Sequence, residues 1–145
     1  MLKINKFKVI ISDLDGTLLN DEHKISSFTK TVFQELYRQN YIIIIATGRH
    51  HLDAMPVVKT MGIPVYLVTS NGARIHDPNG ELLFSFDIDS DVIKSVLNLG
   101  IDPEITTVLF KENFWQTSKN NETLNSFQTE LNYVPQIVDF NKIED

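Results

Sequence analysis

Two carboxylates with one residue between them, Asp13 and Asp15, are the residues whose types and spacing most clearly favour chemistry. Carboxylates this close repel each other unless a positive group lies between them. A divalent cation such as Mg²⁺, which prefers carboxylate, water and phosphate oxygens, would remove that repulsion. Gly16 lets the backbone turn sharply against a ligand, and Thr17 adds a hydroxyl group. The pattern favours phosphoryl transfer, although a polar turn after a strand uses the same residue types.

The apolar runs on either side of this chemistry indicate how it would be positioned. Residues 9–11 are apolar and β-branched, which predicts a strand buried on both faces of a parallel sheet. Ligands of such sheets bind beyond the carboxyl ends of the strands, where the two carboxylates stand. A second strand is predicted over residues 41–46 and ends in Thr47, Gly48 and Arg49. Arg49 adds positive charge where an anion would bind, whereas Thr47 alone would also suit a helix N-cap.

The helical and turn patterns complete a βαβαβ half-sheet. One helix is predicted from Ser26 or Ser27 to about Asn40. A second begins at residues 51–53, holds Pro56 in its first turn and ends at Gly62. A third strand over residues 65–69 leads to the turn signal Asn71-Gly72, and strands at 74–76 and 82–86 flank a tight turn. The apolar positions expected to face inward from the second helix are Leu52, Met55, Val58 and Met61.

Three of these segments carry a resemblance to a known family. Residues 13–17, with the sequence Asp-Leu-Asp-Gly-Thr, resemble the first motif of the haloacid dehalogenase superfamily of phosphatases. Thr47-Gly48-Arg49 resembles the second motif. The Asn71-Gly72-Ala73 segment is similar to the Cof-type branch, subfamily IIB, and the first 90 residues are most similar to bacterial pyridoxal-phosphate and sugar-phosphate phosphatases.

The resemblance implies a role for each matched residue. Asp13 would be the nucleophile that becomes an aspartyl-phosphate, and Asp15 the general acid and base. Mg²⁺ would be held by Asp13 and Asp15, through the carboxylate of the first and the backbone carbonyl of the second. The expected phosphate- and substrate-binding residues are Leu14 (through nearby backbone N–H groups), Thr47, Gly48, Arg49 and Asn71. The implied reaction is hydrolysis of small phosphate esters such as sugar phosphates or pyridoxal phosphate.

The second part of the chain resembles the start of an α/β cap. We expect the N-terminal part of the core domain over residues 1–84 and a partial cap of the C2 type over 85–145, with Trp115 in the cap core. A helix opened by Asp89 or Ser90, strands over 106–110, 114–117 and 134–138, and a helix over 122–131 are predicted there.

The family's later motifs, a lysine and an acidic Gly-Asp-x-x-x-Asp segment, have no counterpart after Asn71. The resemblance therefore covers only the N-terminal half of such a phosphatase, and we expect a truncated product or a fragment. Without the strands that carry those motifs, residues 9–11 would form an exposed apolar edge, so self-association or marginal stability is predicted. A non-catalytic remnant with residual metal or phosphate binding, or with a partner-dependent role, is the alternative to an active phosphatase.

Composition sets the broad class. The 145 residues carry a net charge of −6 and a pI of about 5.1, which argues against a nucleic-acid or anionic-membrane partner. The chain has no cysteine, which excludes disulfides and thiolate chemistry, and no apolar run near the ~20 residues of a membrane span. We expect a soluble cytoplasmic protein that acts on small molecules.

The four histidines form no metal-ligand spacing beyond the adjacent pair His50 and His51. Neighbouring side chains on a helix do not face each other. Most of the four, including His23 and His76, are therefore expected at the surface or in ordinary hydrogen bonds. A substrate contact by His50 or His51, which follow Arg49 at the mouth of the predicted site, is left open.

Overall fold

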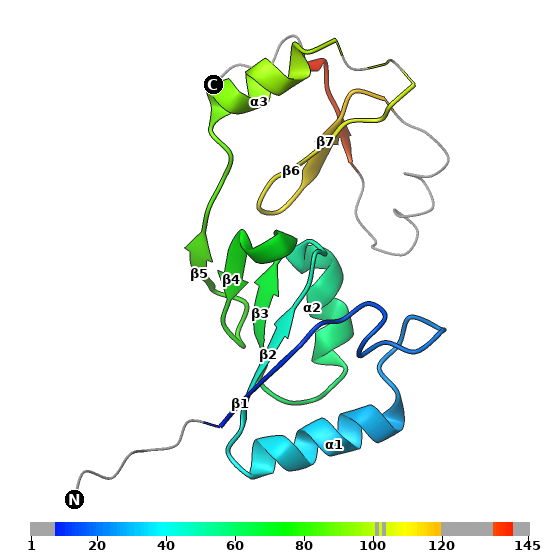
Figure 1. The fold of residues 1–145 in the computed structure, drawn as a ribbon, viewed down its shortest axis with the longest axis vertical. Coiled ribbons are helices and arrows are strands. Elements are labelled where there is room, and N and C mark those ends of the chain that lie inside the picture. The colour runs from blue at the N-terminus through cyan, green and yellow to red at the C-terminus, as the bar shows by residue number, and fades with distance from the viewer. Residues whose placement is uncertain (1–7, 101, 103, 120–134, 141–145) are drawn as a thin grey trace, which may run out of the picture. The chain divides into compact units, whose positions relative to one another are not determined.

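The structure is a computed structural model that describes residues 8–100, 102, 104–119 and 135–140. The chain divides into two units, Met1–Phe86 and Asp87–Asp145. Each unit holds its own sheet (Figure 1). No helix among the described residues is both long enough and apolar enough to cross a membrane.

The sheet of the first unit has five strands in the order β1-β2-β3-β4-β5. The first three, β1 (Val9–Ser12), β2 (Ile42–Ala46) and β3 (Tyr66–Thr69), run parallel, while β4 (Arg74–His76) and β5 (Leu82–Ser85) add an antiparallel hairpin. This confirms the predicted α/β class. Because parallel strands end at the same edge, the loops after β1, β2 and β3 meet there.

Two helices link the parallel strands. The first, α1 (Ser27–Arg38), begins at the predicted cap: the Ser26 hydroxyl accepts a hydrogen bond from the Thr29 N–H at 3.1 Å. The second, α2 (His51–Lys59), has His50 as its N-cap. The sequence predicted Pro56 in the first turn of this helix. Because α2 already begins at His51, Pro56 instead lies inside the helix. A short 3₁₀ turn, η1 (Ser70–Gly72), follows β3.

The core of this unit lies between the helices and one face of the sheet. Ile43, Ile45 and Leu67 point into it from β2 and β3 and are fully buried. The predicted inward set is confirmed for Val58 and for Met61 just beyond α2, which are buried, and in part for Met55, which is partly buried and packs against the core. Leu52 is only partly buried and is not part of this core, whereas His51 and Ala54 are buried. The apolar residues of α2 are spread around the helix axis, so their pattern did not specify which side faces the core.

Burial of β1 on both faces, predicted from its apolar run, is wrong for the described part of the chain. The burial alternates along the strand, and Val9 and Ile11 are 43% and 66% exposed. The run correctly indicated a strand of a parallel sheet, but no described element covers its second face.

The second unit contains α3 (Ser90–Leu97), which is capped by Asp89 as predicted. It also holds a sheet of β6 (Val108–Phe110), β7 (Trp115–Thr117) and β8 (Gln136–Ile137) in that order. Trp115 is buried and stacks on Phe110 with ring centroids 6.1 Å apart, in agreement with its predicted place in a core. The helix predicted over 122–131 lies outside the described residues. The function of this unit as a cap stays a prediction.

Candidate active site

The loop after β1 carries the two carboxylates on a tight turn. Gly16 adopts a φ of +70°, a conformation that the β-carbon of other residues disfavours, so this position requires glycine. Leu14 is fully buried and anchors the turn in the core, while its carbonyl accepts hydrogen bonds from the N–H groups of Leu18 and Leu19. The Thr17 hydroxyl donates to the Asp13 carboxylate at 3.2 Å. Asp13 is therefore held at the carboxyl end of β1 with its side chain exposed.

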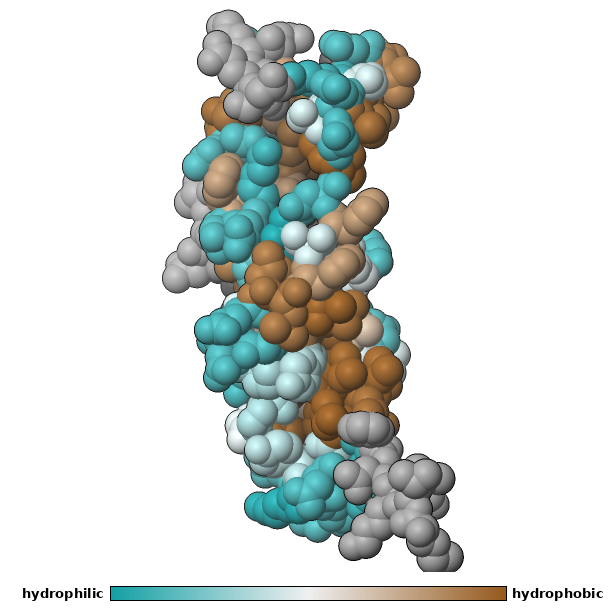
Figure 2. Space-filling model, turned by 90° about the vertical axis from the view of Figure 1, so that its left-hand side faces the viewer, coloured by the Kyte–Doolittle hydropathy of each residue, from teal (hydrophilic) through white to brown (hydrophobic). Residues whose placement is uncertain are grey.

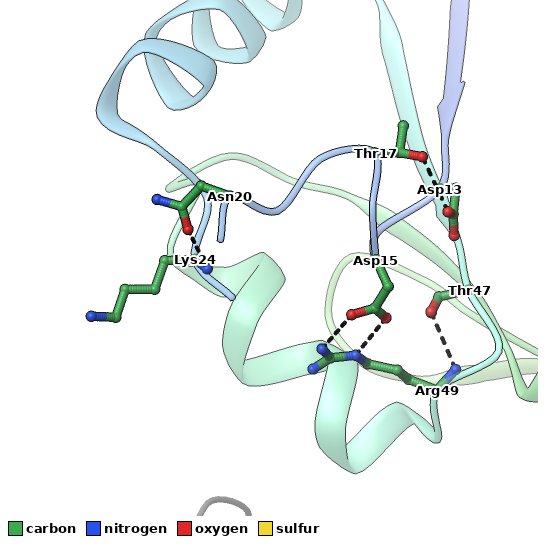
Figure 3. Close-up of polar contacts among 7 residues, drawn as sticks. All are labelled: Asp13, Asp15, Thr17, Asn20, Lys24, Thr47 and Arg49. Atoms are coloured by element: carbon green, nitrogen blue, oxygen red, sulfur yellow. Dashed lines mark hydrogen bonds and ion pairs between the residues drawn. The ribbon is translucent and has the colours of Figure 1, made fainter. Parts of the chain in front are cut away.

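An ion pair joins this loop to the loop after β2. The Arg49 guanidinium donates through Nε to Oδ2 of Asp15 at 2.7 Å and through Nη2 to Oδ1 at 2.5 Å, a two-pronged contact visible in Figure 3. The hydrogen bonds from Arg49, with its positive charge as a smaller contribution, lower the pKa of Asp15 below its ordinary value. Because the Asp15 side chain is about half exposed, at 47%, solvent weakens this pair.

Hydrogen bonds also join the loops after β2 and β3. The Asn71 N–H donates to the Thr47 carbonyl at 3.3 Å, and the Ser70 N–H donates to the Arg49 carbonyl at 2.9 Å. The Thr47 hydroxyl accepts from the Arg49 N–H at 3.2 Å (Figure 3). Ser70 and Asn71 both adopt positive φ values, 51° and 55°, so this connection holds two residues in a sparsely populated conformation.

Gly48 lies directly against Asn71. A β-carbon placed on Gly48 would come within 2.9 Å of the Asn71 Oδ1 atom. Glycine is needed here for space and not for its φ, which is not among the positive values. The structure thus brings Asp15, Thr47, Gly48, Arg49 and Asn71 into one chain of contacts, with Asp13 at the end of the neighbouring strand. How Leu14, Thr47, Gly48 and Asn71 act on a phosphate stays a prediction.

The carboxylates fit Mg²⁺ only in part. Among the residues that the structure describes, no group of three or more His, Cys, Asp or Glu side chains is placed to hold a metal ion. Both Asp15 carboxylate oxygens accept from Arg49, and the group of this residue that the resemblance assigns to Mg²⁺ is its backbone carbonyl. One Asp13 carboxylate and one carbonyl suit a hard cation that keeps several waters, but they do not form a complete site.

Three histidines, His50, His51 and His76, are buried beside these loops, so of the two expected placements, at the surface or in ordinary hydrogen bonds, the surface is excluded for them. The rings of His50 and His51 are 4.5 Å apart, and those of His51 and His76 are also 4.5 Å apart. His50 is an N-cap with extended backbone, so the rule about neighbours on a helix does not hold for this pair. Its Nδ1 atom accepts from the Leu52 N–H at 3.3 Å.

The titration of this cluster follows from its burial. Burial, with smaller contributions from His50, His76 and Arg74, lowers the pKa of His51 to about 4, and the ring is therefore neutral at pH 7. Burial also raises the pKa of Asp53 in the first turn of α2.

Sequence reasoning missed His76 and Asp53 as neighbours of this region. The signal for His76 was available in the predicted hairpin, because its partner across the ladder, Leu67, belongs to the buried face, and paired residues share a face. No comparable signal marked Asp53.

Comparisons with known proteins agree on one family. The family model of haloacid dehalogenase-like hydrolases matches residues 10–145. A protein of Buchnera aphidicola subsp. Baizongia pistaciae, named provisionally as a phosphatase, is 36% identical over 138 residues, which are 94% of this chain and 52% of the relative. The HMP-PP phosphatase of Serratia proteamaculans is 32% identical over 111 residues, 77% of this chain and 40% of that enzyme.

Solved structures give the same result. A haloacid dehalogenase-like hydrolase from B. subtilis matches with a TM-score of 0.73 and 30% identity, and the match covers 84% of this chain and 43% of that one. The structure of SMU.1108c from Streptococcus mutans, at 17% identity and a TM-score of 0.80, shares the fold. The chain spans about half the length of the curated relatives it matches first. Since the family model extends from β1 to the end of the sequence, this chain belongs to the family of haloacid dehalogenase-like hydrolases.

Proposed function

We propose that this chain carries the nucleophile and the phosphate-binding loops of a Mg²⁺-dependent phosphatase that hydrolyses small phosphate esters through an aspartyl-phosphate. One observation carries the proposal: the Asp15 carboxylate and the loops after β2 and β3 are tied together by direct contacts at the end of the strand that holds Asp13. Family membership and the phosphatase names of its relatives support the same chemistry.

In the proposed reaction an Asp13 carboxylate oxygen attacks phosphorus, the bond to the leaving oxygen breaks, and that oxygen takes a proton from Asp15. Water then attacks the phosphorus of the aspartyl-phosphate and gives a proton to Asp15, which releases phosphate and restores both residues. Thr47, Gly48 and Asn71 would hold the phosphate. Mg²⁺, when bound to the Asp13 carboxylate and the Asp15 carbonyl, neutralises charge on the transferring group.

The ion pair between Arg49 and Asp15 adds a condition to this scheme. A carboxyl with a lowered pKa is a poor proton donor at pH 7, so Asp15 can act as an acid only after Arg49 leaves it. An arriving phosphate would compete with Asp15 for the Arg49 guanidinium. The two nitrogens that could donate to its oxygens, Nε and Nη2, already donate to the Asp15 carboxylate in this structure. Substrate binding would thereby free Asp15 for its protonation and place Arg49 on the phosphate.

The test is Mg²⁺-dependent phosphate release from a hexose phosphate, pyridoxal phosphate, HMP-PP and an aryl phosphate, with Asp13→Asn as the matched control. Turnover that requires both Mg²⁺ and Asp13 supports the proposal. Phosphate release that survives Asp13→Asn contradicts it. Cytoplasmic location and the preferred ester are parts of the same proposal, since they follow from the resemblance to metabolite phosphatases.

The second candidate is a non-catalytic remnant that binds phosphate or acts through a partner. The incomplete set of metal ligands among the described residues favours it. A folded chain that binds inorganic phosphate but releases none from any ester, alone or with a partner, would favour the remnant over the enzyme.

A further inference from the structure

Three histidine rings are packed together in the core beside the loops after β2 and β3. The ring of His51 is 4.5 Å from that of His50 and 4.5 Å from that of His76, and the second pair is stacked. All three side chains are at least nine-tenths buried. We call these residues the histidine cluster. Rings buried this deeply present almost no surface to a substrate, so any effect on catalysis must pass through the residues that they hold.

The cluster connects the loop after β2 with the strand that follows the Asn71 turn. His50 directly follows Arg49 and is the N-cap of α2, where its Nδ1 atom accepts a backbone hydrogen bond from the first turn at 3.3 Å. His76 lies on β4, which begins after η1 with one residue between them. His51, the first residue of α2, packs against both. The three rings therefore join the backbone that carries Arg49 to the backbone that leaves Asn71.

The register of β4 buries a histidine in preference to an isoleucine. His76 pairs with Leu67 and faces the core, whereas Ile75 pairs with Phe84 and faces the other side of the sheet. On that side Phe84 is 48% exposed. Figure 2, which looks at the side of the chain where β5 lies, shows apolar side chains gathered at the surface. A shift of one residue would exchange the two faces of β4, so hydrophobicity alone would favour burying Ile75. The strand instead takes the register in which His76 stacks on His51.

The turn between the two loops needs support because its backbone is strained. Ser70 and Asn71 have φ values of 51° and 55°, and residues other than glycine keep such values only where the surrounding structure fixes them. Before the turn, the N–H groups of these residues donate to the carbonyls of Arg49 and Thr47. After the turn the chain enters β4, where His76 is held in the cluster. The cluster thus secures the side of the turn that those two hydrogen bonds do not reach.

The rings hold their places by different interactions. His50 needs a ring nitrogen, because its Nδ1 atom caps α2. The Nδ1 atom of His51 is buried and has no hydrogen-bond partner among the described residues. Burial is the largest cause that lowers the pKa of His51 to about 4, so this ring is neutral at pH 7. A neutral ring held by packing can be replaced by another flat ring, whereas an aliphatic side chain would fill the space without stacking.

We propose that His51 and His76 are positioning residues whose stacked rings fix the N-terminus of α2 against β4. Through this contact they hold Arg49 and Asn71 at the spacing that a phosphate requires. The inference rests on the proposed function, which makes this spacing matter, but the ion pair between Arg49 and Asp15 reports the same geometry without a ligand. A metal site does not explain the cluster, because no three His, Cys, Asp or Glu side chains in the described part of the chain are placed to hold an ion.

The experiment compares His76→Ala, which removes the stacked ring, with His76→Phe, which keeps a flat ring. Val58→Ala is the matched control, because Val58 is also buried on α2 but lies near the other end of the helix. The readouts are titration with inorganic phosphate and the NMR resonance of the Arg49 Nε–H group in the ligand-free protein, with urea denaturation to establish that each variant is folded.

The expected result separates positioning from packing. His76→Ala should bind phosphate roughly tenfold or more weakly, as for a lost hydrogen bond to a charged group, and should move the Arg49 resonance toward that of a free guanidinium. His76→Phe should behave like the wild type in both readouts. Val58→Ala should lower stability and change neither.

Several outcomes would overturn the proposal. Wild-type phosphate affinity in folded His76→Ala would do so, and so would an equal loss in Val58→Ala. If His76→Ala does not fold, His76→Leu fills the space without stacking, and phosphate binding equal to that of His76→Phe would show that only volume matters. If even the wild type binds no phosphate, the proposed function fails while the Arg49 resonance still decides: a change in His76→Ala but not in His76→Phe supports the positioning, and no change refutes it.

Discussion

Gly48→Ala is the substitution that most directly tests the contact between the loops after β2 and β3. The added β-carbon would lie 2.9 Å from the Asn71 Oδ1 atom and 3.6 Å from its Cγ atom. The first distance is shorter than van der Waals contact, so the amide must rotate away. The backbone of Gly48 itself can accept alanine, because its φ is not positive.

The cost follows from the side chain that has to move. Turning the Asn71 side chain about 30° off its rotamer costs roughly 0.5–1.5 kcal/mol, so we expect Gly48→Ala to lower the free energy of unfolding by about 1 kcal/mol. If the displaced amide also contacts a bound phosphate, losing a hydrogen bond to a charged group costs about 1.5–3 kcal/mol, which is roughly a tenfold to hundredfold loss of affinity.

A double-mutant cycle with Asn71→Gly gives the decisive measurement. Glycine removes the side chain and accepts the positive φ of this position. Urea denaturation and titration with inorganic phosphate of the four proteins would then yield the coupling free energy. Gly48→Ala should have almost no effect in the Asn71→Gly background. An equal loss in both backgrounds would refute the side-chain clash, because the cost would then come from the backbone.

Three other perturbations have expected outcomes. Arg49→Gln should raise the pKa of Asp15 toward its ordinary value, which carboxyl NMR would follow. The ion pair stabilises the fold at pH values above that ordinary pKa, and the substitution should remove this contribution, about 1 kcal/mol or less for a pair this exposed. An unchanged titration would exclude Arg49 as the cause. The free energy of unfolding of the wild type should fall as the pH drops from about 6.5 to 4, because His51 binds a proton in the unfolded state but not in the folded state, where its pKa is about 4. The loss is at most about 3 kcal/mol. His51→Phe should flatten this pH dependence in acid denaturation curves. Thr47→Val removes the acceptor of the Arg49 N–H, so thermal unfolding should show a loss of about 1 kcal/mol, and no loss would mean that water replaces the hydroxyl.

The sequence was sufficient for the parts of the fold that depend on local patterns. The Ser26 cap of α1 and the hairpin of β4 and β5 rest on short-range chemistry, and the structure has both. The convergence of Asp15, Thr47 and Asn71 was also predictable, because it follows from the topology of parallel strands.

Other features depend on what packs against each element. The apolar run of β1 indicated burial on both faces, but burial requires a second layer, and the run carries no information about whether that layer is present. The inward face of α2 was misjudged at Leu52, which is apolar but only partly buried, and the burial of His51 in the same helix was not expected. The ion pair of Asp15 and Arg49 joins residues 34 positions apart, and no pattern of spacing predicts a contact between side chains at that separation.

The position of Asp13 links the proposed chemistry to the edge of the sheet. Asp13 directly follows β1, whose ladder has a partner on one side only among the described strands. A strand paired on one side opens more easily than one paired on both, so an uncovered β1 would hold the nucleophile less firmly. Displacement of a reacting group by about 1 Å can cost roughly a hundredfold in rate. If the proposed function holds, turnover should depend on how firmly β1 holds Asp13. Ile11→Lys, which places a charge in this edge strand, should then lower turnover while leaving the contacts among Asp15, Arg49 and Asn71 intact.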